Sequence, residues 1–120
     1  MTNTGREILL GAVGEEEFAR HVKRLARRYG WCGYHVRYSQ AVVEGVHTAR
    51  LDGHGDAFGM PDWILAKPGH QLLLPELKRT AGRVTRDQAR WLERLNATTG
   101  VVAPVWRPEM EDEITRVLKG

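Results

Sequence analysis

Apolar residues recur at helical spacing in two long stretches of the chain, and each stretch predicts an amphipathic helix. The first runs from about Gly14 to Tyr29, with Phe18 and Val22 on its apolar face. The second starts at Thr85 to Gln88, which has the form of a capping box, and it ends between Asn96 and Gly100. Both helices carry basic residues on their other faces, so each is expected to flank a sheet.

Three shorter stretches have the alternation or the continuous apolar character of β-strands. Trp31 to Tyr38 alternates between aromatic or apolar positions and polar ones. Trp63 to Ala66 and Gln71 to Leu74 are short apolar runs on either side of Lys67-Pro68-Gly69-His70, whose Pro-Gly pair is typical of a turn. These two runs therefore predict a β-hairpin.

A further strand is predicted at Val101 to Trp106, and Pro108-Glu109 begins a final helix. No period persists from 39 to 58, where glycines interrupt the chain, so this region is expected to be a long loop. Residues 1–13 are expected to be a flexible N-terminal segment. The predicted order, α-β-β-β-α-β-α, implies an α/β fold in which helices flank a mixed β-sheet.

Composition limits the chain to one domain, residues 1–120. With 42% hydrophobic residues it can bury one core and has no room for a second. The single cysteine, Cys32, excludes an intrachain disulfide, which suits a reducing cytosol. No window reaches the roughly 18 continuous apolar residues that a membrane span needs. We therefore expect a cytoplasmic protein without a membrane partner.

Two acids and a lysine stand at the open end of the predicted hairpin. Asp62 opens its first strand and Glu76 closes its second, so antiparallel pairing brings Glu76 back beside Asp62. Because side chains alternate along a strand, Glu76 and Lys78 point to one side and Leu77 to the other. Carboxylates bind Mg²⁺, and an ammonium group steadies a water or a phosphate, so the set favours metal-assisted phosphodiester cleavage. The alternative is a surface Glu-x-Lys without a catalytic role.

A third acid is predicted to face the same region. At about 100° per residue, Glu15 lies close to Val22 and Ala26 on the apolar face of the first helix, whereas Glu16 and Glu17 fall on its flanks. A carboxylate directed inward favours a place in the acidic cluster. The alternative is favourable charge at a helix N-terminus, which suits all three glutamates equally.

The order of these motifs resembles the VRR-NUC branch of the PD-(D/E)xK nucleases. The residues that carry the resemblance are Gly59-Met60-Pro61-Asp62, Glu76-Leu77-Lys78, Gln88 and Trp91-Leu92, with softer matches at Tyr29-Gly30-Trp31, His35 and Val105-Trp106-Arg107-Pro108. The resemblance runs from about Glu15 to the C-terminus and implies a restriction-endonuclease-like core. Pro75 departs from the pattern: proline removes a donor from a central strand, which predicts a local irregularity beside Glu76.

The resemblance also implies roles for these residues. The metal ligands for one or two Mg²⁺ or Mn²⁺ ions would be Asp62, Glu76, the backbone carbonyl of Leu77 and the nearby Glu15. Lys78 would position or deprotonate the attacking water, and Gln88 would hold the lysine or a water near the cluster, unless it serves only as a helix cap. Stand-alone members of this size, of bacterial or phage origin, resemble Holliday-junction resolvases that act as homodimers, so we expect a DNA endonuclease of this kind.

Basic side chains near the motifs are candidates for contacts with DNA phosphates. They are His35 and Arg37 on one face of the predicted strand, Arg79 and Arg83 after Lys78, and the stripe of Arg86, Arg90 and Arg94 along the second helix. A polar strand face and a solvated helix face are the alternatives. The net charge of +3 is mild, so the arrangement of these charges matters more than their number.

Three other functions stay open at the level of sequence. The first is a nuclease of the same chemistry that prefers flaps, splayed ends or ordinary duplex. The second is a DNA-binding module without catalysis, and the third is a structural or partner-binding domain with incidental acids. Nothing in the motifs reads bases, so a four-way junction would be recognised by its shape and by a dimer that presents two active sites.

Overall fold

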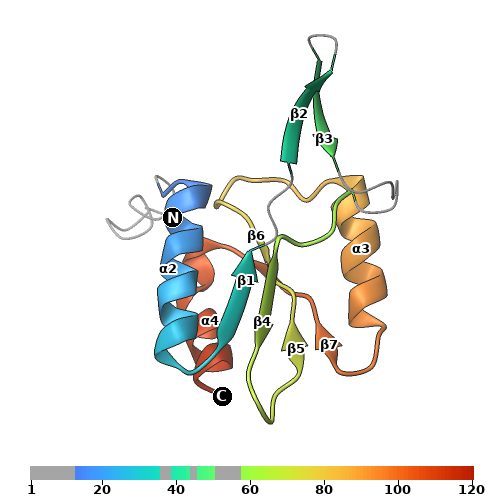
Figure 1. Ribbon diagram of the computed structural model, residues 1–120. Helices are drawn as coiled ribbons and strands as arrows, with labels where there is room; N and C mark the ends of the chain where they lie inside the picture. The colour runs from blue at the N-terminus through green and yellow to red at the C-terminus, as the bar shows by residue number, and fades with distance from the viewer. Residues whose placement is uncertain (1–12, 36–38, 44–45, 51–57) are drawn as a thin grey trace, which may run out of the picture.

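The computed structural model describes residues 13–35, 39–43, 46–50 and 58–120, and in these ranges it is an α/β fold with a mixed sheet and three α-helices (Figure 1). The helices are α2 (Glu15–Arg28), α3 (Arg86–Asn96) and α4 (Glu111–Lys119), with the 3₁₀ helix η2 (Pro108–Met110) before α4. The strands are β1 (Cys32–His35), β2 (Ser39–Val43), β3 (Val46–Arg50), β4 (Trp63–Ala66), β5 (Leu72–Leu73), β6 (Glu76–Leu77), β7 (Val101–Val102) and β8 (Val105–Trp106).

Four strands form the central sheet, in the order β1-β4-β5-β7. Strand β4 pairs antiparallel with β1 and with β5, and β5 pairs parallel with β7. The predicted hairpin is confirmed, with Leu65 opposite Leu73. Helix α3 makes the crossover from β6 to β7 that a parallel pair requires, and this connection makes the sheet mixed.

The strand that carries Glu76 is irregular, as Pro75 predicts. Strand β5 ends at Leu73, and β6 pairs with β8 in a separate parallel ladder. One row of amide donors nevertheless runs through the break, from Leu72, Leu74, Glu76 and Lys78 to the carbonyls of Gly100, Val102, Pro104 and Trp106. Pro75 lies between two donor positions of this row, so its missing N–H costs nothing there. Pro104 occupies the position that would donate back to Leu74, and this missing donor explains the break.

Alternate residues of the strands enter two cores, one on each face of the sheet. Helices α2 and α4 cover the first face, whose core includes Leu65, Leu73 and Leu77 (Figure 1). Helix α3 covers the second face, where Leu74 packs with Leu92 and Ala103. The period of two along β4 to β6 therefore decides which helix layer each side chain meets.

The sequence predicts a long loop at 39–58, but the described residues 39–43 and 46–50 form strands. Strands β2 and β3 form an antiparallel hairpin, with Val43 opposite Val46, that stands away from the rest of the ribbon (Figure 1). Within the described residues β2 pairs with β3 alone, so no central sheet imposes a hydrophobic alternation on this part of the sequence. The overlooked signal was the two-residue connection Glu44-Gly45 between stretches rich in β-branched residues.

The predicted strand at 31–38 is observed as β1, and residues 36–38, with Arg37, lie outside the described residues. The same holds for residues 1–12 of the segment expected to be flexible, whereas Val13 packs against the first core. Across the described ranges, we find no helix with an apolar stretch long enough to traverse a lipid bilayer.

Candidate active site

Asp62 and Glu76 lie near each other at the open end of the β4–β5 hairpin. Leu65 pairs with Leu73 in this hairpin; Asp62 precedes β4, Glu76 follows β5, and the charge of Asp62 acts on Glu76. Asp62 is half-buried and Glu76 is only 5% exposed. Glu76 follows Leu74 by two residues, so its side chain is directed to the face that α3 covers. The hairpin thus holds two carboxylates in a place with little access to water.

Burial makes both acids harder to ionise. Burial raises the pKa of Glu76 from 4.5 to about 7; the Lys78 ammonium opposes this shift, while the charges of Asp62 and Glu15 add to it. Burial also raises the pKa of Asp62, with His35 and Lys78 opposing and Glu15 adding. The site therefore places two carboxyl groups where burial makes their ionised form costly, and a bound cation would offset that cost.

Lys78 and Gln88 both contact the same oxygen of Glu76. The Nζ atom of Lys78 lies 3.6 Å from Oε1 of Glu76, and Nε2 of Gln88 donates a hydrogen bond of 3.0 Å to that atom. The Oε1 atom of Gln88 accepts from the backbone N–H of Thr85, whose Oγ1 accepts from the backbone N–H of Gln88. The predicted capping box is confirmed, and Gln88 uses one end of its amide to cap α3 and the other to hold Glu76.

Replacing Gln88 should therefore lower the free energy of unfolding more than replacing Thr85, its capping partner, does. We expect Thr85→Ala to lower the free energy of unfolding by about 1 kcal/mol through loss of the cap. Gln88→Met removes both side-chain hydrogen bonds and should cost about 2 kcal/mol. Urea unfolding at pH 8, where Glu76 is ionised, measures both variants. Equal losses in the two variants would mean that the bond to Glu76 contributes nothing.

The charge of Glu15 acts on both acids of the site. Of the three glutamates in the first turn of α2, Glu15 is the one whose charge acts on Asp62 and Glu76. Its side chain is exposed, which corrects the prediction that it is directed into the apolar face. The reason is its position as the first residue of the helix, one turn before the first buried residue, Phe18.

His35 is the last residue of β1, and its charge acts on Asp62. It is half-buried, pairs with Trp63 across the β1–β4 ladder and stacks on the Trp63 ring at 4.5 Å between centroids and 9° between planes. Its charge lowers the pKa of Asp62. The polar strand face that the sequence offered as an alternative is thus an aromatic stack at the edge of the site.

The predicted arginines Arg79, Arg83, Arg86 and Arg90 are all exposed, and they follow the strand that carries Glu76 or lie on α3. Sequence reasoning gave no role to Arg107, which fixes the segment that carries the first of them. Its Nη1 atom donates to the carbonyls of Arg79, Thr80 and Gly82, at 2.9, 3.3 and 2.6 Å. These bonds hold the chain after Lys78 to the chain after β8. The backbone N–H of Lys78 adds a further bond, to the carbonyl of Trp106 at 3.0 Å.

Gly59, at the start of the Gly-x-Pro-Asp motif, lies against the first turn of α3. Its φ is +85°, and a Cβ atom there would lie 2.6 Å from the carbonyl oxygen of Asp87 and from the backbone nitrogen of Gln88. Gly69 also has a positive φ, +83°, but a Cβ atom there would meet open space. Glycine is thus required at 59 by contact as well as by conformation.

The two glycines form a matched pair of variants. Gly69→Ala should lower the free energy of unfolding by about 1 kcal/mol through the positive φ alone. Gly59→Ala adds a backbone collision and should cost about 2 kcal/mol more. Chemical denaturation of both variants provides the comparison, and losses of the same size would refute a close contact between Gly59 and α3.

The described residues contain no group of three or more His, Cys, Asp or Glu side chains close enough to hold a metal ion. Glu15 therefore does not join Asp62 and Glu76 as a third close carboxylate. Two carboxylates are nevertheless a usual number for Mg²⁺, which keeps several waters when it binds to protein. Asp62 and Glu76, with their raised pKa values, fit this donor set.

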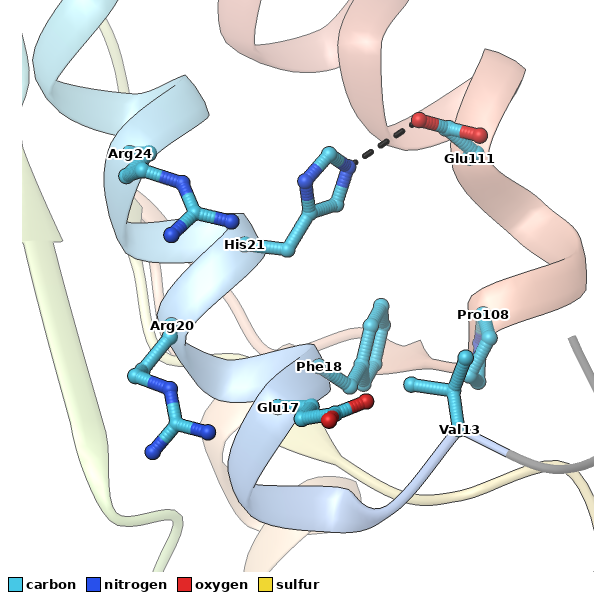
Figure 2. A pocket seen from close by; sticks show the side chains of 8 residues that line it. All are labelled: Val13, Glu17, Phe18, Arg20, His21, Arg24, Pro108 and Glu111. Atoms are coloured by element: carbon cyan, nitrogen blue, oxygen red, sulfur yellow. Dashed lines mark hydrogen bonds and ion pairs between the residues drawn. The ribbon is translucent and has the colours of Figure 1, made fainter.

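A cavity of about 470 Å³ lies elsewhere, where α2 meets α4. Phe18 and Pro108 line it, and a contact of 3.0 Å between Nε2 of His21 and Oε1 of Glu111 spans it (Figure 2). None of the predicted site residues lines this cavity. The two acids therefore belong to a separate site.

Comparisons of the chain with protein-family models, with curated proteins and with solved structures gave no match.

Proposed function

We propose that this protein is a metal-dependent DNA endonuclease with a PD-(D/E)xK core of the VRR-NUC type. The observation that supports the proposal best is the joint position of Asp62, Glu76 and Lys78. A half-buried aspartate acts through its charge on a buried glutamate, and the lysine two residues later contacts that glutamate at 3.6 Å. A surface Glu-x-Lys would leave all three side chains in water, with no shift in the pKa of either acid.

In this proposal the residues that hold Mg²⁺ or Mn²⁺ are Asp62, Glu76 and the backbone carbonyl of Leu77. The burial of the two carboxyl groups supports a cation there, because a cation would offset the cost of ionising them, and the charge of Glu15 in the first turn of α2 adds to the negative potential at both. When bound, the ion supplies Lewis-acid stabilisation of the phosphate and lowers the pKa of a water.

The remaining side chains orient the reacting groups. Gln88 and Lys78 fix the carboxylate of Glu76 from two directions, so that its free lone pairs are directed to the site. We assign Lys78 to holding the attacking water or the developing phosphate charge as a cation. The low exposure of its side chain, 12%, keeps this charge in a medium where it acts strongly.

We propose that the exposed arginines of residues 79–90 contact the phosphates on either side of the cut. Arg107 supports this role, because its three hydrogen bonds to backbone carbonyls hold the segment that carries Arg79. The substrate we favour is a four-way junction, cut by a homodimer in the cytoplasm of a bacterium or a phage-infected cell. Flaps, ends and plain duplex require the same chemistry but no fixed separation of two active sites.

The test is cleavage of labelled DNAs with Mg²⁺, with Mn²⁺ and with EDTA. The panel contains a four-way junction, a flap, a splayed end and a linear duplex, and the mass of the protein in solution is measured beside it. We expect metal-dependent cutting, with symmetric nicks in the junction. Binding of DNA without cutting under every metal condition would make the protein a non-catalytic DNA-binding module.

A further inference from the structure

A surface apart from the candidate active site lies between α2 and β1, the outer strand of the sheet. A groove of about 370 Å³ separates them, with Lys23 and Arg27 of α2 on one side and Gly33 of β1 on the other. Its floor consists of buried residues, Ala26 and Leu65, each only 1% exposed. A floor of core side chains keeps its shape, so the groove exists before anything binds.

Among the described residues, the strand beside this groove has one unpaired edge. Strand β1 is the outermost in the order β1-β4-β5-β7, and among the described strands it pairs with β4 alone. Cys32, Gly33 and Tyr34 are all exposed, Tyr34 by 64%. Every second residue of such a strand presents its N–H and C=O away from the sheet, which is a template for one more strand.

Helix α2 runs alongside that edge. It ends in a closed turn, in which Gly30 has a φ of +88° and the N–H of Trp31 donates to the carbonyl of Ala26 at 3.0 Å. This turn sends β1 back next to the helix (Figure 1). Lys23 and Arg27 are one helical turn apart, about 6 Å along the axis, which is close to the roughly 6.8 Å between alternate residues of a strand. Two cations of the helix therefore match alternate side chains of a strand added to β1.

We propose that this groove binds an extended acidic segment of a partner protein, which adds a strand to the edge of β1. Main-chain hydrogen bonds to β1 give the binding mode, and carboxylates at alternate positions meet Lys23 and Arg27. A second copy of this chain fits less well, because pairing of two β1 edges would bring the same cations together. Nucleic acid would satisfy the cations but has no amide groups for the strand. This inference does not depend on nuclease activity.

Cys32 provides a direct readout, since it is the single cysteine of the chain and is exposed on the groove. The probe is an acetylated, amidated peptide of alternating glutamate and threonine, and the signal is the rate at which a thiol reagent modifies Cys32. We expect the peptide to slow this reaction and a lysine-threonine peptide to leave it unchanged. In the double variant Lys23→Glu/Arg27→Glu, the peptide concentration needed to slow the modification of Cys32 to the same extent should rise by about tenfold or more.

The matched control is Arg24→Glu/Arg28→Glu, which makes the same change of net charge on another side of α2. It should leave the protection nearly unchanged. Four results would each overturn the proposal. The first is that the peptide does not protect Cys32, and the second is that both double variants lose this protection equally. The third is that a single-stranded oligonucleotide protects Cys32 equally or better, and the fourth is that protection appears without peptide when the protein concentration is raised. The last would show that the edge pairs two copies of the chain.

Discussion

Asp62→Asn is expected to reduce DNA cleavage by about a thousandfold or more, with DNA binding largely retained. The substitution keeps the shape of a half-buried side chain but removes the negative charge that a divalent ion at this site requires. Loss of metal-assisted charge stabilisation costs several kcal/mol in the transition state, and about 4 kcal/mol corresponds to three orders of magnitude. Single-turnover cleavage and a binding titration on the same DNA measure the two quantities separately.

Asp112→Asn on α4 is the control, because it makes the same chemical change at an exposed position that the proposed mechanism does not use. It should cut like the unaltered protein. Lys78→Ala should reduce cutting by about a hundredfold or more, because it removes one electrostatic partner of the reacting groups. Cleavage by Asp62→Asn at a rate close to that of the Asp112 control would remove Asp62 from the mechanism.

The sequence predicted the local structure around the candidate site well where short-range rules decide it. The Pro-Gly turn between two apolar runs gave the hairpin, and the period of two along its strands gave the direction of Glu76, Leu77 and Lys78. The Thr85-x-x-Gln88 spacing gave the helix cap. Each of these features depends on residues that are close in sequence, so a pattern carries it.

Features that depend on contacts between distant segments were not predictable. Nothing local to Gly59 indicates that the first turn of α3 lies against it, and nothing local to Arg107 indicates that three carbonyls of residues 79–82 surround its guanidinium. The raised pKa of Glu76 likewise depends on packing from both helix layers. Glu15 shows the converse: a helical wheel set it apart from Glu16 and Glu17, but the wheel could not tell that burial along α2 begins only at Phe18, so that Glu15 is exposed.

The stability of the metal-free protein should fall as pH rises from about 5 to 8. The pKa of Glu76 is about 7 in the folded protein, above its usual 4.5, so the folded state holds this proton more tightly than the unfolded chain does. Below pH 4.5 both states are protonated and the group has no effect; above pH 7 the folded state alone bears the cost of a buried charge. The full difference corresponds to about 3 kcal/mol, and the raised pKa of Asp62 acts in the same direction.

Glu76→Gln tests this directly, since it fixes the side chain in a neutral form. In urea unfolding with EDTA, the variant should show a shallower decline with pH and should be more stable than the unaltered protein at pH 8, whereas Glu113→Gln at an exposed position should keep the decline. Mg²⁺ offers the reverse route, because an ion that binds only the folded state stabilises it by about 2.7 kcal/mol at one hundred times its dissociation constant. At pH 8, Mg²⁺ should therefore stabilise the unaltered protein and have little effect on Glu76→Gln. If the free energy of unfolding of Glu76→Gln still falls with pH as in the unaltered protein, a group other than Glu76 causes the fall. If Mg²⁺ stabilises both proteins equally, the ion binds away from these acids.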